Sequence, residues 1–128
     1  SYLSIKPADI EVQVSADFEL FGPRYLFQNA IANLLTNSVK SLKEAGKGTI
    51  KVVIARAESW GTIEFTDTGT GIERMRLDTI FAPGVSYAST GTGFGLSFCK
   101  SVIERMGGEI RCESNFGSYA TFFIKIPI

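Results

Sequence analysis

Three glycines, Gly91, Gly93 and Gly95, stand within five residues, and an apolar, helix-like segment follows them. Glycine costs about 0.5–1 kcal/mol relative to alanine inside regular structure, so such a cluster marks unusual backbone geometry. Before a helix, a loop of this kind directs several backbone N–H groups toward one anion. A Walker A loop is excluded because Leu96, not lysine, follows the last glycine. A dinucleotide fingerprint is excluded because the spacing is G-x-G-x-G after a Ser/Thr-rich segment.

The composition describes one ordinary globular domain. The 128 residues suit a single unit over 1–128 that buries a core without disulfide or metal staples. Basic and acidic residues both number 13, so the formal net charge is zero. General attraction to nucleic acid or to an anionic membrane is not indicated, and we expect contact with neither. The absence of histidine excludes a Ser-His triad and any histidine-liganded metal within the chain.

The two cysteines, Cys99 and Cys112, are isolated and lack metal-binding spacing. No charged-then-apolar leader stands at the start of the sequence. We therefore expect reduced, partly buried thiols and a cytoplasmic setting.

Hydrophobic periodicity and turn residues predict a mixed order of elements. Strands are expected at residues 10–14, 18–21, 48–58, 60–67, 109–114 and 119–128. Helices are expected from Arg24 to about Glu44, within residues 72–81, and at 94–106, the two long ones ended by glycines. An irregular, hydroxyl-rich loop is expected over 82–92. This order indicates an α+β or α/β sandwich with helices on one face of the sheet.

The first long helix carries an unusual polar strip. At 3.6 residues per turn, one face presents Asn29, Asn33, Asn37 and Lys40, and the opposite face carries the apolar side chains of Phe27, Ile31, Leu34, Leu35 and Leu42. Asparagine is a poor helix former, so three asparagines on one face of the helix indicate carboxamides directed at a ligand. Their oxygens can coordinate Mg²⁺ and their NH₂ groups can donate to phosphate. The helix by itself is equally compatible with a polar surface.

A second chemical signal lies in "FTDTGTGI", residues 65–72. A strand ends at Asp67, and Gly69 and Gly71 then allow a flat ligand to approach the backbone. An aspartate there can accept a hydrogen bond from an exocyclic amine, and adenine is the commonest ligand of that kind. Taken alone, the segment is more typical of a plain Asp-Gly turn.

Together, these segments resemble the ATP-binding fold of sensor histidine kinases, DNA gyrase, MutL and heat-shock chaperone ATPases, the GHKL superfamily with its Bergerat-type fold. The quoted stretches "NLLTNSVK", "DTGTGI", "IFAPG" and "TGTGFGLSFCKSVIERMGG" resemble the N box, first glycine box, F box and second glycine box. The ending "GSYATFFIKIPI" resembles the closing strand, so the likeness runs from about Ile10 to Ile128. It implies an α+β, two-layer α/β sandwich, with a mixed sheet of about five strands against about three helices.

The resemblance also implies roles for matched positions, with ATP and Mg²⁺ as cofactors. Asn37 would hold the metal, Asn33 and Lys40 would address the phosphates, and these three form the implied catalytic set. Asp67 would read the adenine amino group, and a mobile lid would cradle the triphosphate. The implied nucleotide-binding residues are Asp67, Gly69, Gly71, Ile72, Gly91, Thr92, Gly93, Phe94, Gly95, Leu96 and Thr121.

Within the superfamily, the residue at position 33 separates two branches. Members that hydrolyse ATP place a glutamate there, whereas Asn33 cannot act as a general base near neutral pH. The resemblance therefore implies a protein histidine kinase of a two-component system, acting on a histidine in a separate dimerisation domain. A response regulator would be a further partner, and the parent would be a membrane-bound sensor with this part in the cytoplasm.

Several positions depart from the family pattern. Many members have an aromatic residue after the N-box lysine, stacking on adenine, where this chain has Ser41. Residues 77–99 contain no lysine or arginine, Gly84 replaces the second F-box aromatic, and Tyr119 replaces a glycine. These departures keep open a non-catalytic nucleotide-binding signalling module, or a GHKL-type ATPase, as alternatives to the kinase.

Overall fold

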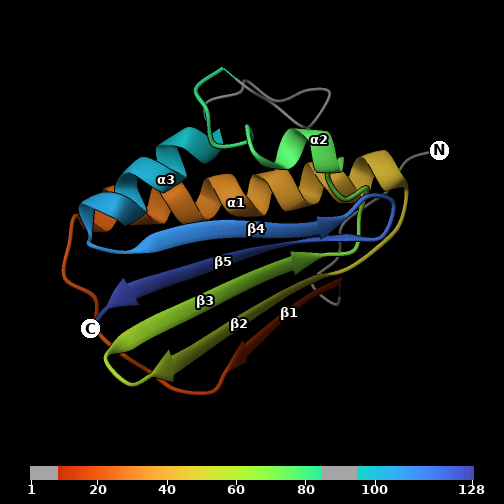
Figure 1. Ribbon diagram of the computed structural model, residues 1–128. Helices are drawn as coiled ribbons and strands as arrows, with labels where there is room; N and C mark the ends of the chain where they lie inside the picture. Colours follow the sequence, from red (N-terminus) through yellow and green to blue (C-terminus); the bar gives the residue numbers. More distant parts are fainter. Residues whose placement is uncertain (1–8, 85–94) are drawn as a thin grey trace.

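The computed structural model describes residues 9–84 and 95–128 (Figure 1). No helix within these ranges combines the length and apolar character needed to cross a membrane. The elements are β1 (Ile10–Val14), α1 (Arg24–Ala45), β2 (Ile50–Ala57), β3 (Trp60–Asp67), α2 (Arg74–Leu77), α3 (Gly95–Arg105), β4 (Glu109–Asn115) and β5 (Tyr119–Pro127).

The sheet has five strands in the order β1-β2-β3-β5-β4. β1 runs parallel to β2, and the other three neighbouring pairs are antiparallel. The helices lie over one face of this sheet (Figure 1). The predicted α+β architecture, a two-layer sandwich with a mixed five-stranded sheet and three helices, is confirmed.

The core lies between the sheet and the helices. Leu34 and Leu42 of α1 are fully buried against strand residues such as Phe65 and Phe122. The remaining apolar residues of the α1 stripe are partly buried and border an apolar cavity of about 340 Å³ beside β1, namely Phe27, Ile31 and Leu35. With this face fixed inward, the asparagine strip is held at the opposite side of the helix.

The structure also has the glycines that were predicted to end the two long helices. Gly46 takes a left-handed conformation, with φ of 75°, and its N–H donates to Leu42 O at 2.9 Å. Gly107, with φ of 81°, lies two residues after the end of α3, and its N–H donates to Glu104 O at 3.0 Å. Left-handed backbone of this kind is the usual place for glycine after a helix.

Two local predictions were wrong. The expected strand at 18–21 is irregular, because Phe18 and Leu20 pack against the core without joining the sheet. A Cβ on Gly61 would meet the Phe18 ring at 2.5 Å, so this contact depends on a glycine. The β2–β3 turn lies at Glu58 and Ser59, one residue before the expected place. The short helix expected within residues 72–81 is found as α2. Most of the expected loop over 82–92 lies outside the described residues.

Candidate functional site

The site is built around Asp67, the last residue of β3. Register pairs it with Ile50 on one side and Ala120 on the other, on the face that the helices cover. Its side chain is 1% exposed. Oδ1 accepts a hydrogen bond from Gly69 N at 3.1 Å, whereas Oδ2 has no hydrogen-bond partner among residues 9–84 and 95–128. A buried carboxylate oxygen without a donor is costly, so the arrangement is one that a ligand donor would stabilise.

Burial raises the pKa of Asp67 above its ordinary value of 3.8. The Gly69 N–H, and then the nearby hydroxyls of Ser41 and Ser38, lower the pKa only in part. Both serines come from α1 and are almost completely buried. Within the described residues, the groups that act on the carboxylate are therefore a backbone N–H and two hydroxyls rather than a positive charge, which suits recognition of a neutral N–H donor.

The loop after Asp67 is held from the side of α1. Ser41 Oγ accepts a hydrogen bond from Thr70 N at 3.0 Å and shares a second with Thr70 Oγ1 at 3.2 Å. A Cβ on Gly69 would collide with the Ser41 hydroxyl and backbone. The glycine is needed there because helix and loop backbone lie in direct contact.

The same loop is held from the opposite side by the turn between β4 and β5. Gly117 N donates to Thr70 O at 2.6 Å, and Ile72 N donates to Ser114 Oγ at 2.7 Å. Gly71 has φ of 69°, and a Cβ there would meet Asn115 O at 2.5 Å. Ser114 was not predicted, since its place on the inner face of β4 has no distinctive sequence pattern.

The asparagine strip is only partly exposed. Asn29 is exposed, whereas Asn33, Asn37 and Lys40 are half-buried. The first residue of α3 lies beside this strip, since a Cβ on Gly95 would be 3.7 Å from Asn33 Cγ. The structure thus places Gly95, the last glycine of the cluster at residues 91–95, beside Asn33.

The other predicted site residues divide into three groups. Ile72 and Leu96 are buried in the core beside the site. Thr121 is not brought to the site: it pairs with Thr66, and their Oγ1 atoms lie 2.9 Å apart on the sheet face opposite Asp67. Strand alternation places Ala120, not Thr121, opposite the carboxylate. Four predicted nucleotide-binding residues lie outside the described ranges: Gly91, Thr92, Gly93 and Phe94.

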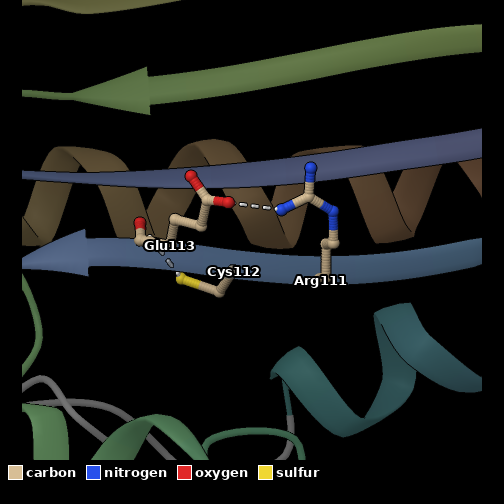
Figure 2. Close-up of polar contacts among 3 residues, drawn as sticks. All are labelled: Arg111, Cys112 and Glu113. Carbon is tan, nitrogen blue, oxygen red and sulfur yellow. Dashed lines mark hydrogen bonds and ion pairs between the residues drawn. The ribbon is translucent and has the colours of Figure 1, made fainter.

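β4 carries different chemistry on its two faces. Arg111 and Glu113 form a 2.7 Å ion pair on the exposed face (Figure 2). Cys112 lies between them in sequence, and burial, reinforced by the charges of Asp67 and Glu113, raises the pKa of its thiol to about 12. Burial likewise raises the pKa of Cys99 to about 12, and its Sγ lies 3.0 Å from Ala30 O. Both are free, protonated thiols near neutral pH, so neither is an activated nucleophile.

Comparisons with known proteins agree with this geometry. The family described as histidine kinase-, DNA gyrase B- and HSP90-like ATPase matches residues 22–128. Sporulation kinase B of Bacillus subtilis (strain 168) is 31% identical over 127 residues, covering 99% of this chain and 29% of that protein. Sensor histidine kinase DcuS of Escherichia coli (strain K12) is 35% identical over 97 residues, covering 76% of this chain and 18% of that protein.

A solved structure shows the same likeness. The nucleotide-free catalytic domain of histidine kinase ThkA matches with a TM-score of 0.81 and 26% identity, over 93% of this chain and 78% of that one. The chain spans less than a third of the two curated relatives, at 29% and 18% of their lengths.

The loop after Asp67 is held by Ser41 on one side and by Ser114 and Gly117 on the other, and we call these contacts the clamp. The clamp predicts unequal effects of two similar glycine substitutions. Gly46 and Gly71 both have positive φ, but a Cβ on Gly46 meets open space whereas one on Gly71 meets backbone. We expect Gly46→Ala to lower the free energy of unfolding by about 1 kcal/mol, from strain alone. Gly71→Ala should lower it by roughly 3 kcal/mol or more, because a clash adds to the strain. Urea denaturation measures both, and equal losses would contradict the clamp.

The pKa of Asp67 predicts a pH-dependent difference between the native chain and Asp67→Asn. Because the folded-state pKa is raised, the folded protein holds this proton over a pH window in which the unfolded chain has lost it. The stabilising effect of the raised pKa is present below about pH 4 and is lost as pH rises through the folded pKa. The stability of the variant relative to the native chain should therefore increase with pH. Parallel curves in urea denaturation at stepped pH would contradict this.

Proposed function

The chain belongs to the family of histidine kinase-, DNA gyrase B- and HSP90-like ATPases, and from this we propose that it binds Mg-ATP and transfers the γ-phosphoryl group to a histidine of a separate dimerisation domain. Its relatives include Sporulation kinase B and sensor histidine kinase DcuS, and a structural neighbour is the catalytic domain of histidine kinase ThkA. The observation that carries the proposal is the buried, unpartnered Oδ2 of Asp67 beside the asparagine-lined helix α1.

The adenine base suits the polar surroundings of Asp67. Its exocyclic amino group is a neutral donor that would satisfy Oδ2. Guanine carries an oxygen at the equivalent place, which would face the carboxylate without a proton between them. The proposed site therefore selects adenine over guanine by an unpaired-acceptor penalty.

The triphosphate would extend from the base at Asp67 along α1. Asn33 and Lys40 would donate to its oxygens, and the amide oxygen of Asn37 would be a ligand of Mg²⁺. The nucleotide, when bound, supplies the phosphoryl group and most of the metal's remaining oxygen ligands. Within the described ranges, His, Cys, Asp and Glu side chains form no cluster of three or more able to hold a metal.

Transfer is favoured over hydrolysis because of Asn33. A carboxamide does not take a proton from water near neutral pH, so the site positions and neutralises phosphate without activating water. The acceptor has to come from elsewhere, since the sequence contains no histidine. We propose that it belongs to a helical dimerisation domain of the parent kinase, that a response regulator then receives the phosphoryl group, and that the domain works in the cytoplasm.

A second candidate is a module that binds nucleotide without efficient transfer. Ser41 favours it, because this side chain is 1% exposed and turned into the loop, so it offers no surface for stacking on the base. The lack of lysine and arginine over residues 77–99 points the same way. Binding and transfer have to be measured separately to distinguish the two candidates.

Nucleotide binding is tested by calorimetric titration with ADP and Mg²⁺. We expect Asp67→Asn to weaken ADP binding at least tenfold, or about 1.4 kcal/mol. Asparagine has one acceptor oxygen, whereas the proposed site needs one for the Gly69 N–H and a second for the adenine amino group. Glu64→Gln is the matched control, since Glu64 lies three residues earlier on the same strand, is exposed, and faces away from the helices. It should bind like the native chain. Equal binding by all three proteins would remove Asp67 from base recognition.

Transfer is tested with γ-labelled ATP and the histidine-bearing domain of the parent kinase. We expect label on that domain in its native form and none when its histidine is replaced by glutamine. Phosphate release by this chain alone should be slow, because Asn33 is not a base. Rapid phosphate release without the acceptor would instead identify an ATPase, and binding without label on the acceptor would favour the signalling module.

A further inference from the structure

The residue after Lys40 does something unexpected in this chain. Ser41 would be placed by its sequence position at the nucleotide, yet it is 1% exposed and directed at the loop that follows Asp67. Its hydroxyl accepts from Thr70 N at 3.0 Å and shares a hydrogen bond with Thr70 Oγ1 at 3.2 Å. Both bonds cross between elements 29 residues apart in sequence. Ser41 thus joins the helix to the loop by hydrogen bonds and does not offer a surface to the ligand.

Thr70, the partner of Ser41, is held through all of its polar groups. Besides the two bonds to Ser41, Thr70 O accepts from Gly117 N at 2.6 Å, and its Oγ1 lies 3.2 Å from Gly71 O. The loop is therefore fixed to α1 on one side and to the β4–β5 turn on the other. Removing the Ser41 hydroxyl leaves the helix side without a hydrogen bond to this residue.

The position of this loop decides which oxygen of Asp67 is free. Gly69 N, one residue before Thr70, donates to Oδ1 and leaves Oδ2 unpartnered. If the loop shifts, the Gly69 N–H shifts with it, and the orientation of the carboxylate is no longer fixed. Close contact of Gly69 with Ser41 removes the space in which the loop could settle differently.

We propose that Ser41 is a positioning residue for base recognition: through Thr70 it fixes the loop so that Asp67 Oδ2 is presented to the amino group of the purine. The inference rests on the proposed nucleotide binding and adds a determinant of purine selectivity that does not touch the ligand. It also joins the phosphate-facing helix to the base-reading loop, because Ser41 directly follows Lys40 in α1.

The test compares ADP with inosine diphosphate, which carries an oxygen in place of the amino group. The proteins are the native chain, Ser41→Ala, Thr70→Val, the double variant, and Thr36→Val. Thr36 is a matched control, because it is an exposed α1 residue whose hydroxyl donates within its own helix, to Ala32 O at 2.8 Å. Binding is measured by calorimetry with Mg²⁺, and far-UV circular dichroism and urea denaturation identify the conditions in which each protein is folded.

We expect the native chain and Thr36→Val to prefer ADP at least tenfold. Ser41→Ala should weaken ADP binding by about three- to tenfold, the effect of one lost hydrogen bond, and change inosine diphosphate binding less than twofold. Thr70→Val should weaken ADP binding less than Ser41→Ala does, since Thr70 N keeps its hydrogen bond to Ser41. The double variant should bind ADP about as weakly as Ser41→Ala, because the two hydroxyls act together. If Ser41→Ala does not fold, Thr70→Val alone has to lower the preference for ADP.

The possible failures are distinguishable. Unchanged preference for ADP in the folded Ser41 and Thr70 variants would overturn the positioning role, as would equal weakening for both nucleotides, which is what a purely structural role produces. In either case the preference of the native chain would leave the proposed nucleotide site standing. If the native chain binds neither nucleotide, or binds them equally, the proposed function itself fails.

Discussion

The contact between the backbone of α1 and the loop after Asp67 is the constraint on which the site depends. Gly69 has no space for a side chain because the Ser41 hydroxyl and backbone occupy it, and Gly71 has none because Asn115 O occupies it. A loop held so closely on two sides has little freedom to repack, which is the condition for holding a polar group away from water. The rest of the fold, with α1 anchored by Leu34 and Leu42, keeps these surfaces together.

The buried carboxylate is a feature that a protein selected for stability alone would avoid. Asp67 sits in the apolar layer in line with Phe65, and only one of its oxygens has a hydrogen bond. Functional sites commonly break the rule that buried polar groups are satisfied, and the surrounding structure offsets the cost. In the proposed function, the nucleotide supplies the missing hydrogen-bond donor. The buried carboxylate that destabilises the nucleotide-free protein would therefore provide its affinity and selectivity for adenine.

Much of this was accessible from sequence because the signals are local. The 3.6-residue period predicted α1, glycines predicted the ends of both long helices, and the break after Asp67 predicted the end of β3. What failed depends on pairing between distant segments. Thr121 and Ala120 differ by one residue, and only the β3–β5 register decides which of them faces Asp67. Likewise, no local sequence pattern predicts that Ser41 points inward, because this orientation follows from its hydrogen bond with Thr70, 29 residues away in sequence. Phe18 alternates like a strand residue but packs on Gly61 instead.

The most direct measurement of the central claim is a crystal structure of the chain with ADP and Mg²⁺. The account predicts the adenine amino nitrogen at roughly 2.7–3.2 Å from Asp67 Oδ2, with the carboxylate and the Ser41–Thr70 hydrogen bonds unchanged. The phosphates should lie along α1 at Asn33, Asn37 and Lys40. A base bound elsewhere, or one that reaches Asp67 only after the loop has moved away from Ser41, would contradict it.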